Sequence, residues 1–155
     1  MSLHHNFPSS PYEPLIPAQR WFPADEALRA TAYEKLLPPL VAKVREEVFA
    51  WRAKGYAGAS ATSAALLRHW FEREHLVENA DGSLSSFRYY FAQREAAETV
   101  IWLFEVRRAR EKYDLLRFDA SGAVSSGMFD EDWPRYVVKM ATGAGKTKVL
   151  SLLIA

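Results

Sequence analysis

Apolar residues recur at intervals of three and four over two stretches in the first half of the chain, a spacing that places them on one face of a helix. The first predicted helix covers residues 41–54 and ends at Gly55, with apolar positions Leu40, Val44, Val48 and Trp51. The second covers residues 63–74, after a turn at 58–63 with candidate capping residues, and has apolar positions Leu66, Leu67, Trp70 and Phe71. A shorter helix is predicted over residues 25–37, before Pro38 and Pro39.

The second half of the chain shows further patterns. Residues 78–86, which contain Asp81 and Gly82, are typical of a surface turn. Residues 87–117 predict one helix of ~45 Å, long enough to accommodate a break near Tyr113. Beyond a loop at 119–133, the run Tyr136-Val137-Val138 predicts a short buried strand, and the apolar stretch 149–155 predicts a buried helix. The chain is therefore predicted to be mostly helical, with one or two short strands.

The composition is typical of one domain with a hydrophobic core. The net charge gives the chain no overall attraction to nucleic acid. The chain has 155 residues, and 49% of them are hydrophobic. Its 20 Lys and Arg against 19 Asp and Glu leave a net charge of +1, so contact with nucleic acid would need a local patch. Without cysteine, disulfides and thiolate zinc sites are excluded. No signal-peptide pattern and no apolar run near the ~20 residues of a membrane span occurs, so we expect a cytoplasmic protein with no membrane partner.

The first 24 residues form a separate region, a proline- and aromatic-rich arm. Proline removes backbone donors and favours extended chain, so the arm is expected to be extended. Its aromatic residues, which include Tyr12, Trp21 and Phe22, are expected to dock, most simply onto the same chain.

A glycine-rich loop lies between the predicted strand and the last predicted helix. It consists of Thr142, Gly143, Ala144, Gly145, Lys146 and Thr147. Because glycine has no Cβ, the main chain at Gly143 and Gly145 can turn its N–H groups onto phosphate oxygens. Lys146 would reach the β and γ phosphates, and the Thr147 hydroxyl would join the coordination of Mg²⁺ at the positive end of the helix. This order of strand, loop and helix predicts a nucleoside triphosphate site in which Lys146 and Thr147 serve catalysis and Thr147 is the metal ligand.

One position departs from the general phosphate-loop pattern, because Met140 stands where that pattern has its first glycine. The alternative interpretation is a glycine-rich turn that carries a lysine and a threonine by chance. The fitting segments on both sides favour the phosphate-binding interpretation.

The run from Met140 to Thr147 resembles motif I of superfamily-two DEAD/DEAH-type helicases, in the form found in the Res (motor) subunits of type III restriction enzymes. That family tolerates the substitution at Met140. A second run, residues 88–96, is similar to the adenine-recognition segment of the same proteins. The resemblance implies that Gln93 reads the adenine base and that Arg88 stacks on it, chemistry that an amide and a guanidinium plane can perform. Taken alone, residues 88–96 are also compatible with an ordinary helix start.

The resemblance implies a fold class and a function for the whole protein. The parent would be an α/β protein with RecA-like motor domains, an ATP-dependent DNA helicase or translocase that acts on double-stranded DNA through parts absent here. A DNA-modification subunit would be a second candidate partner. This chain would comprise the arm at 1–24, a helical lead-in at 25–86, and at 87–155 the start of the first motor domain, ending just after motif I. The lead-in also resembles these proteins, less specifically, over residues 41–70.

Two alternatives remain open. The loop could belong to another ATPase or phosphotransferase, in which Gln93 would be incidental, or the chain could be a non-catalytic helical interaction fragment. Hydrolysis also needs an acidic residue on a later strand and arginines from a second domain. Asp130, Glu131 and Asp132 precede the loop and are interpreted as solvated charges. We therefore expect this chain alone not to hydrolyse ATP.

Overall fold

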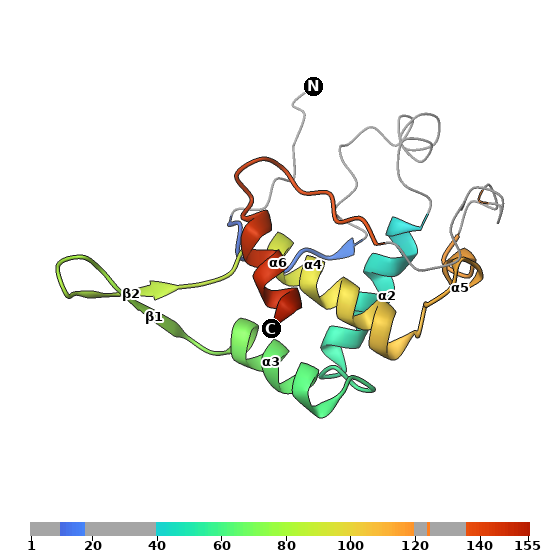
Figure 1. Ribbon diagram of the computed structural model, residues 1–155, viewed down its shortest axis with the longest axis horizontal. Helices are drawn as coiled ribbons and strands as arrows, with labels where there is room; N and C mark the ends of the chain where they lie inside the picture. Colours follow the sequence, from blue (N-terminus) through green and yellow to red (C-terminus); the bar gives the residue numbers. More distant parts are fainter. Residues whose placement is uncertain (1–9, 18–39, 120–123, 125–135) are drawn as a thin grey trace, which may run out of the picture.

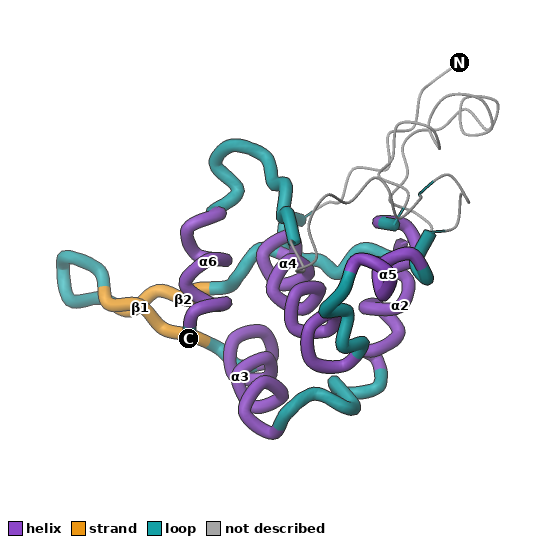
Figure 2. The backbone as a smooth tube through the Cα atoms, turned by 45° about the vertical axis from the view of Figure 1, so that its right-hand side comes forward, coloured by secondary structure: helices purple, strands orange, loops and turns teal. Residues whose placement is uncertain are grey.

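The computed structural model describes residues 10–17, 40–119, 124 and 136–155. Within them, helices gather into a body from which one β-hairpin projects (Figure 1). Helix α4 (Phe91–Ile101) passes between α2 (Val41–Ala53) and α6 (Lys146–Ile154), and α3 (Ala61–Glu72) lies along one side (Figures 1 and 2). The helix predicted over 25–37, most of the loop at 119–133, and Trp21 and Phe22 of the arm lie outside the described residues.

The two helices predicted from apolar spacing are confirmed. Helix α2 ends where Gly55 takes a left-handed φ of +67°, which glycine adopts without strain. Helix α3 begins after Ser60, whose hydroxyl accepts a hydrogen bond from the Ser63 N–H at 3.1 Å. Each helix turns its predicted apolar face inward, so that Val48 and Leu67 are both fully buried.

The predicted surface turn at 78–86 is the tip of a longer element. Strands β1 (His75–Glu78) and β2 (Leu84–Phe87) pair antiparallel, with Val77 opposite Ser85. The Asp81 carboxylate accepts hydrogen bonds from the Ser83 N–H and hydroxyl and so closes the turn. The prediction missed the hairpin because four-residue strands with exposed side chains carry no clear apolar alternation.

The single helix predicted over residues 87–117 is wrong. Helix α4 runs into a π-helical turn, η4 (Trp102–Val106), and the chain then reverses before the short helix α5 (Lys112–Leu116). Arg108 adopts a φ of +49°, which a continuous right-handed helix does not allow. The break therefore falls at residues 107–111, just ahead of Tyr113.

The strand predicted at Tyr136–Val138 is not formed. Val137 is 82% exposed and Val138 40% exposed, and no strand among the described residues pairs with them. A β-branched run forms a strand only where a neighbour supplies its hydrogen bonds. Tyr136 is nevertheless anchored, because its hydroxyl donates to the Ala109 carbonyl oxygen.

Helix α6 is confirmed and begins three residues earlier than its apolar stretch. Val149 and Leu152 are buried, and α6 packs chiefly against α4. Leu150 and Ile154 remain 59% and 75% exposed, so the helix is buried on one face and not all round. Among the described helices, none is long and apolar enough to cross a lipid bilayer.

The described part of the arm docks onto the same chain, as predicted. The Pro11 carbonyl oxygen accepts a hydrogen bond of 2.8 Å from the N–H of Phe91, the first residue of α4. The ring of Tyr12 lies 5.4 Å from that of Tyr90. The arm thus covers the N-terminal end of α4.

Candidate functional site

The glycine-rich loop makes a tight turn and then starts a helix. The Ala144 N–H donates to the Ala141 carbonyl oxygen at 3.2 Å, which closes a four-residue turn with Gly143 at its third position and a φ of +79°. In the type II form of such a turn this position has a positive φ, which glycine adopts without strain. Gly145, at φ +75°, then directs the chain into α6. Both predicted glycines therefore have backbone conformations that favour glycine over other residues.

Lys146 and Thr147 occupy the first turn of α6. Lys146 is exposed, and its ammonium group donates to the Ala141 carbonyl oxygen at 3.2 Å, so it folds back over the turn. Thr147 is also exposed. Within the described part of the chain, no group accepts a hydrogen bond from the N–H groups of Gly145, Lys146 or Thr147. The first turn of a helix leaves such donors free, and together with the ammonium group they form a locally positive end.

Gln93 connects this loop to the predicted adenine-recognition segment. Its side chain is 6% exposed in the first turn of α4. The Oε1 atom accepts a hydrogen bond from the Tyr90 N–H at 2.9 Å, and the Nε2 atom donates to the Gly145 carbonyl oxygen at 3.4 Å. An amide oxygen accepts two hydrogen bonds and an amide nitrogen donates two, so each end of Gln93 keeps one bonding position.

The contact between Gln93 and Gly145 is close enough that a side chain at position 145 would displace the Gln93 amide. A Cβ placed on Gly145 would lie 2.2 Å from Gln93 Nε2, whereas at Gly143 a Cβ would meet nothing within 4 Å. Gly145 is therefore constrained twice, by its positive φ and by the approach of Gln93. Spacing alone did not indicate this second constraint.

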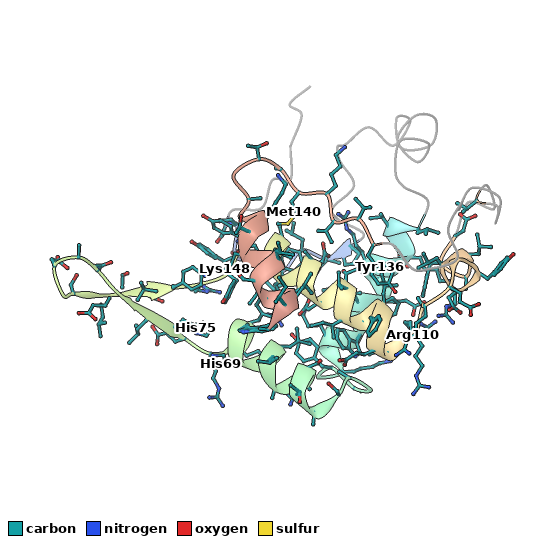
Figure 3. All side chains as sticks on the ribbon, in the orientation of Figure 1. His69, His75, Arg110, Tyr136, Met140 and Lys148 are labelled. Atoms are coloured by element: carbon teal, nitrogen blue, oxygen red, sulfur yellow. The ribbon has the colours of Figure 1, made fainter. Side chains whose placement is uncertain are left out.

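Arg88 lies ahead of α4, beside the arm. Its guanidinium carbon lies 5.3 Å from the ring centroid of Tyr12, a cation–π distance. The ammonium group of Lys148 lies 5.4 Å from the ring centroid of Phe87, the residue before Arg88 (Lys148 is labelled in Figure 3). This segment therefore also borders the first turns of α6. The sequence placed Tyr12 in an arm that docks, but nothing in its spacing indicated that it would meet Arg88.

Predicted site residues from both segments thus approach one another. The contact that unites them is Gln93 with Gly145, and Thr142, Gly143 and Ala144 form the turn just before it. Met140 lies on the segment that leads into this turn (Figure 3). Arg88 contacts Tyr12, and no contact between Arg88 and the loop is observed among the described residues.

The chemistry available here is anion binding. The described residues contain no cluster of three or more histidine, aspartate or glutamate side chains that would hold a metal ion. Thr147 would therefore contribute one hydroxyl to an ion brought in by a ligand. Asp130, Glu131 and Asp132 lie outside the described residues.

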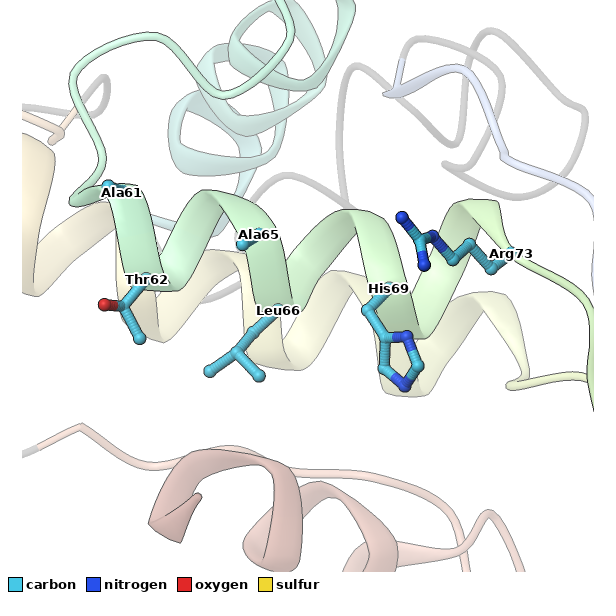
Figure 4. Close-up of a pocket in the computed structure, with 6 residues that line it drawn as sticks. All are labelled: Ala61, Thr62, Ala65, Leu66, His69 and Arg73. Carbon is cyan, nitrogen blue, oxygen red and sulfur yellow. The ribbon is translucent and has the colours of Figure 1, made fainter.

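A shallow hollow of about 600 Å³ lies elsewhere, along one face of α3 (Figure 4). Its lining residues are Ala61, Thr62, Ala65, Leu66, His69 and Arg73. None of the predicted site residues borders it. The loop and Gln93 therefore remain the candidate site.

Comparison of the chain with protein-family models, with curated proteins and with solved structures finds no match.

Proposed function

We propose that this chain binds ATP with Mg²⁺ and is the N-terminal, ATP-binding part of a DNA helicase or translocase of the type III restriction Res-subunit kind. The triphosphate would lie against the main-chain N–H groups of residues 143–147, with the Lys146 ammonium group on the outer phosphates and the Thr147 hydroxyl on Mg²⁺. Backbone donors, one cation and one hydroxyl supply the charge and geometry that a triphosphate needs.

One observation carries the proposal: the hydrogen bond of Gln93 to Gly145, across 52 positions of the sequence. Sequence reasoning selected each residue for a different part of the same ligand, Gln93 for the base and Gly145 for the phosphates. The packing of α6 against α4 brings the two residues together, so a bound nucleotide would meet both of them. The spare donor and spare acceptor of the Gln93 amide match adenine N7 and N6.

The proposal also accounts for exposed apolar groups beside the loop. In a RecA-like domain a parallel sheet is buried on both faces by its helices. Neighbouring strands would pair with residues 136–138 and cover Val137, Leu150 and Ile154, which are 82%, 59% and 75% exposed in this chain. The same exposed groups favour the alternative of an interaction fragment, which predicts self-association without any response to nucleotide.

A titration of the ¹⁵N-labelled chain with MgATP, followed by NMR, tests the proposal. We expect the amide signals of Gly143, Gly145 and Lys146 to shift, with a Kd in the millimolar range, about −4 kcal/mol, because one isolated loop offers few contacts. MgGTP should shift the same loop signals less strongly at equal concentration. A loop that does not respond to MgATP, or that responds equally after Lys146→Ala, would rule out the proposed site.

Hydrolysis is not expected from this chain alone. Phosphoryl transfer needs groups that orient water and stabilise the transferred charge, in addition to a phosphate-binding loop. Double-stranded DNA and a DNA-modification subunit are the partners proposed for the whole protein. Measurable ATP turnover by the purified chain, lost on Lys146→Ala, would overturn this part.

A further inference from the structure

A buried charged network lies on the side of α4 that faces α2. Glu98 is fully buried in the third turn of α4, and its carboxylate accepts hydrogen bonds from three side chains. Arg52 Nε donates at 2.9 and 3.0 Å to its two oxygens, and Arg52 Nη2 donates to Oε2. Arg94 Nε donates to Oε1 at 2.8 Å, as does the Tyr56 hydroxyl. A buried carboxylate is tolerated only with such full pairing.

Tyr56 links the two arginines through this carboxylate. Its hydroxyl also accepts a hydrogen bond of 2.7 Å from Arg94 Nη2, and its side chain is 1% exposed. Burial and the adjacent Glu98 carboxylate both raise the pKa of the Tyr56 phenol, so it stays protonated and donates. The residue follows Gly55 at the end of α2 with a φ of +65°, a conformation that non-glycine residues rarely adopt. The surrounding contacts therefore hold the backbone there against its own preference.

Aromatic rings complete the packing of both guanidinium groups. Arg52 lies 5.2 Å from the ring centroid of Phe91, the first residue of α4. Arg94 lies 5.5 Å from the ring centroid of Phe71 on α3. The network therefore fixes α4 relative to both α2 and α3.

Helix α4 also presents Gln93 to the loop, from its first turn. Gln93 precedes Arg94 in the sequence and contacts Gly145 at the start of α6, while Arg94 joins the network. Helix α4 lies between α2 and α6 in both views (Figures 1 and 2). A rotation or shift of α4 that relieved a broken network would therefore move Gln93 as well.

We propose that Arg52, Tyr56 and Glu98 are positioning residues for Gln93, so that the lead-in helices set the base selectivity of the nucleotide site. This inference rests on the proposed function. Buried charged networks have few alternative arrangements, because charged groups are costly to bury without partners. Among the described residues, Arg52 Nη1 is buried without a hydrogen-bond partner, and the other guanidinium nitrogens named above are paired with Glu98 or Tyr56. With the network intact, α4 has one position, and Gln93 reaches Tyr90 and Gly145 together. Contacts to the triphosphate come from the N–H groups of residues 143–147 and from Lys146, whereas Gln93 bonds the Gly145 carbonyl oxygen, so a shifted Gln93 amide leaves the phosphate donors in place.

The variant Tyr56→Phe tests the inference, because it removes one hydroxyl and preserves the ring. The matched control is Ser63→Ala, which removes a hydroxyl that donates to the Glu105 carboxylate at 2.6 Å, at the start of α3. The probes are MgATP, MgGTP and magnesium tripolyphosphate, titrated by NMR. We expect Tyr56→Phe to reduce the ratio of ATP to GTP affinity about tenfold, the equivalent of one hydrogen bond, with tripolyphosphate affinity unchanged. The control should leave all three affinities unchanged.

A second variant protects the test against misfolding. Arg52→Lys keeps the charge but loses the forked geometry of the guanidinium, so it should lower the same ratio. Unchanged base selectivity in both variants would overturn the positioning role and leave the nucleotide site standing. A parallel loss of tripolyphosphate affinity would also overturn it, since that indicates general loosening. A wild-type chain that binds none of the probes would remove the proposed function and this inference with it.

Discussion

Replacing Gly145 with alanine should loosen α6 by breaking its connection to α4. At φ +75° an alanine costs about 1–2 kcal/mol relative to a relaxed backbone. The new Cβ would lie 2.2 Å from Gln93 Nε2, so the amide must move and give up its bond to the Gly145 carbonyl oxygen. Loss of such a bond costs about 0.5–1.5 kcal/mol. The total cost is therefore about 1.5–3.5 kcal/mol.

Gly143→Ala is the matched control for this substitution. Gly143 has nearly the same φ, +79°, but its added Cβ would meet nothing within 4 Å. It should therefore incur the backbone cost alone, so the two variants should differ by about 1 kcal/mol, a factor of about five in an opening equilibrium. Native-state hydrogen exchange of the α6 amides, from Val149 to Ile154, measures that equilibrium directly.

A double variant isolates the part due to Gln93. Adding Gln93→Ala to Gly145→Ala removes the clash, so the two changes together should cost less than the sum of each alone. Equal hydrogen-exchange rates of the α6 amides in Gly145→Ala and Gly143→Ala would contradict this expectation. So would strict additivity in the double variant, because either result would mean that Gln93 does not press on Gly145.

Three further predictions concern the buried charges and the loop. Glu98→Leu should destabilise the chain by about 3–5 kcal/mol in urea unfolding followed by tryptophan fluorescence, because it leaves buried guanidinium groups without their carboxylate. Burial by itself raises the pKa of Glu105, but hydrogen bonds from Ser63 and Ser60 outweigh it and hold that pKa below the usual 4.5. Its contribution to stability is therefore present above pH 4.5 and is lost as the pH falls through the lowered pKa, so Glu105→Gln should be less stable than wild type at pH 7 and should approach it in acid unfolding curves. Lys146→Ala should weaken magnesium tripolyphosphate binding by about tenfold while leaving the urea midpoint unchanged, because Lys146 is exposed.

The sequence predicted the helices that bury one apolar face, such as α2 and α3. It did not predict the π-helical turn η4 or the separate short helix α5. The spacing of Val44, Val48 and Trp51 predicted α2 because that face packs in the core, where periodicity and burial agree. The region after α4 keeps a similar spacing, yet η4 changes the helical period over Trp102–Val106 and the helix ends at Arg107. A periodicity argument assumes one period throughout and misses such a turn.

The candidate site divides in the same way. Local chemistry predicted the loop, since glycines at positive φ and an exposed lysine at a helix start are properties of a short segment. The approach of Gln93 to Gly145, the contact of Arg88 with Tyr12 and the burial of Glu98 each depend on how distant segments pack. Side-chain packing between elements leaves no signature in local spacing, so these relations became visible only in the structure.

Paramagnetic broadening by MnATP shows whether residues 143–147 surround the phosphates of a nucleotide. Mn²⁺ replaces Mg²⁺ on the phosphates and broadens the NMR signals of nearby amides. At low MnATP we expect broadening to be strongest at Gly145, Lys146 and Thr147 and weak at the hairpin, and Mn²⁺ without nucleotide should not reproduce the pattern. Broadening centred on the acidic hairpin residues Glu78 and Asp81, or the same pattern with Mn²⁺ alone, would mean that residues 143–147 do not bind the nucleotide.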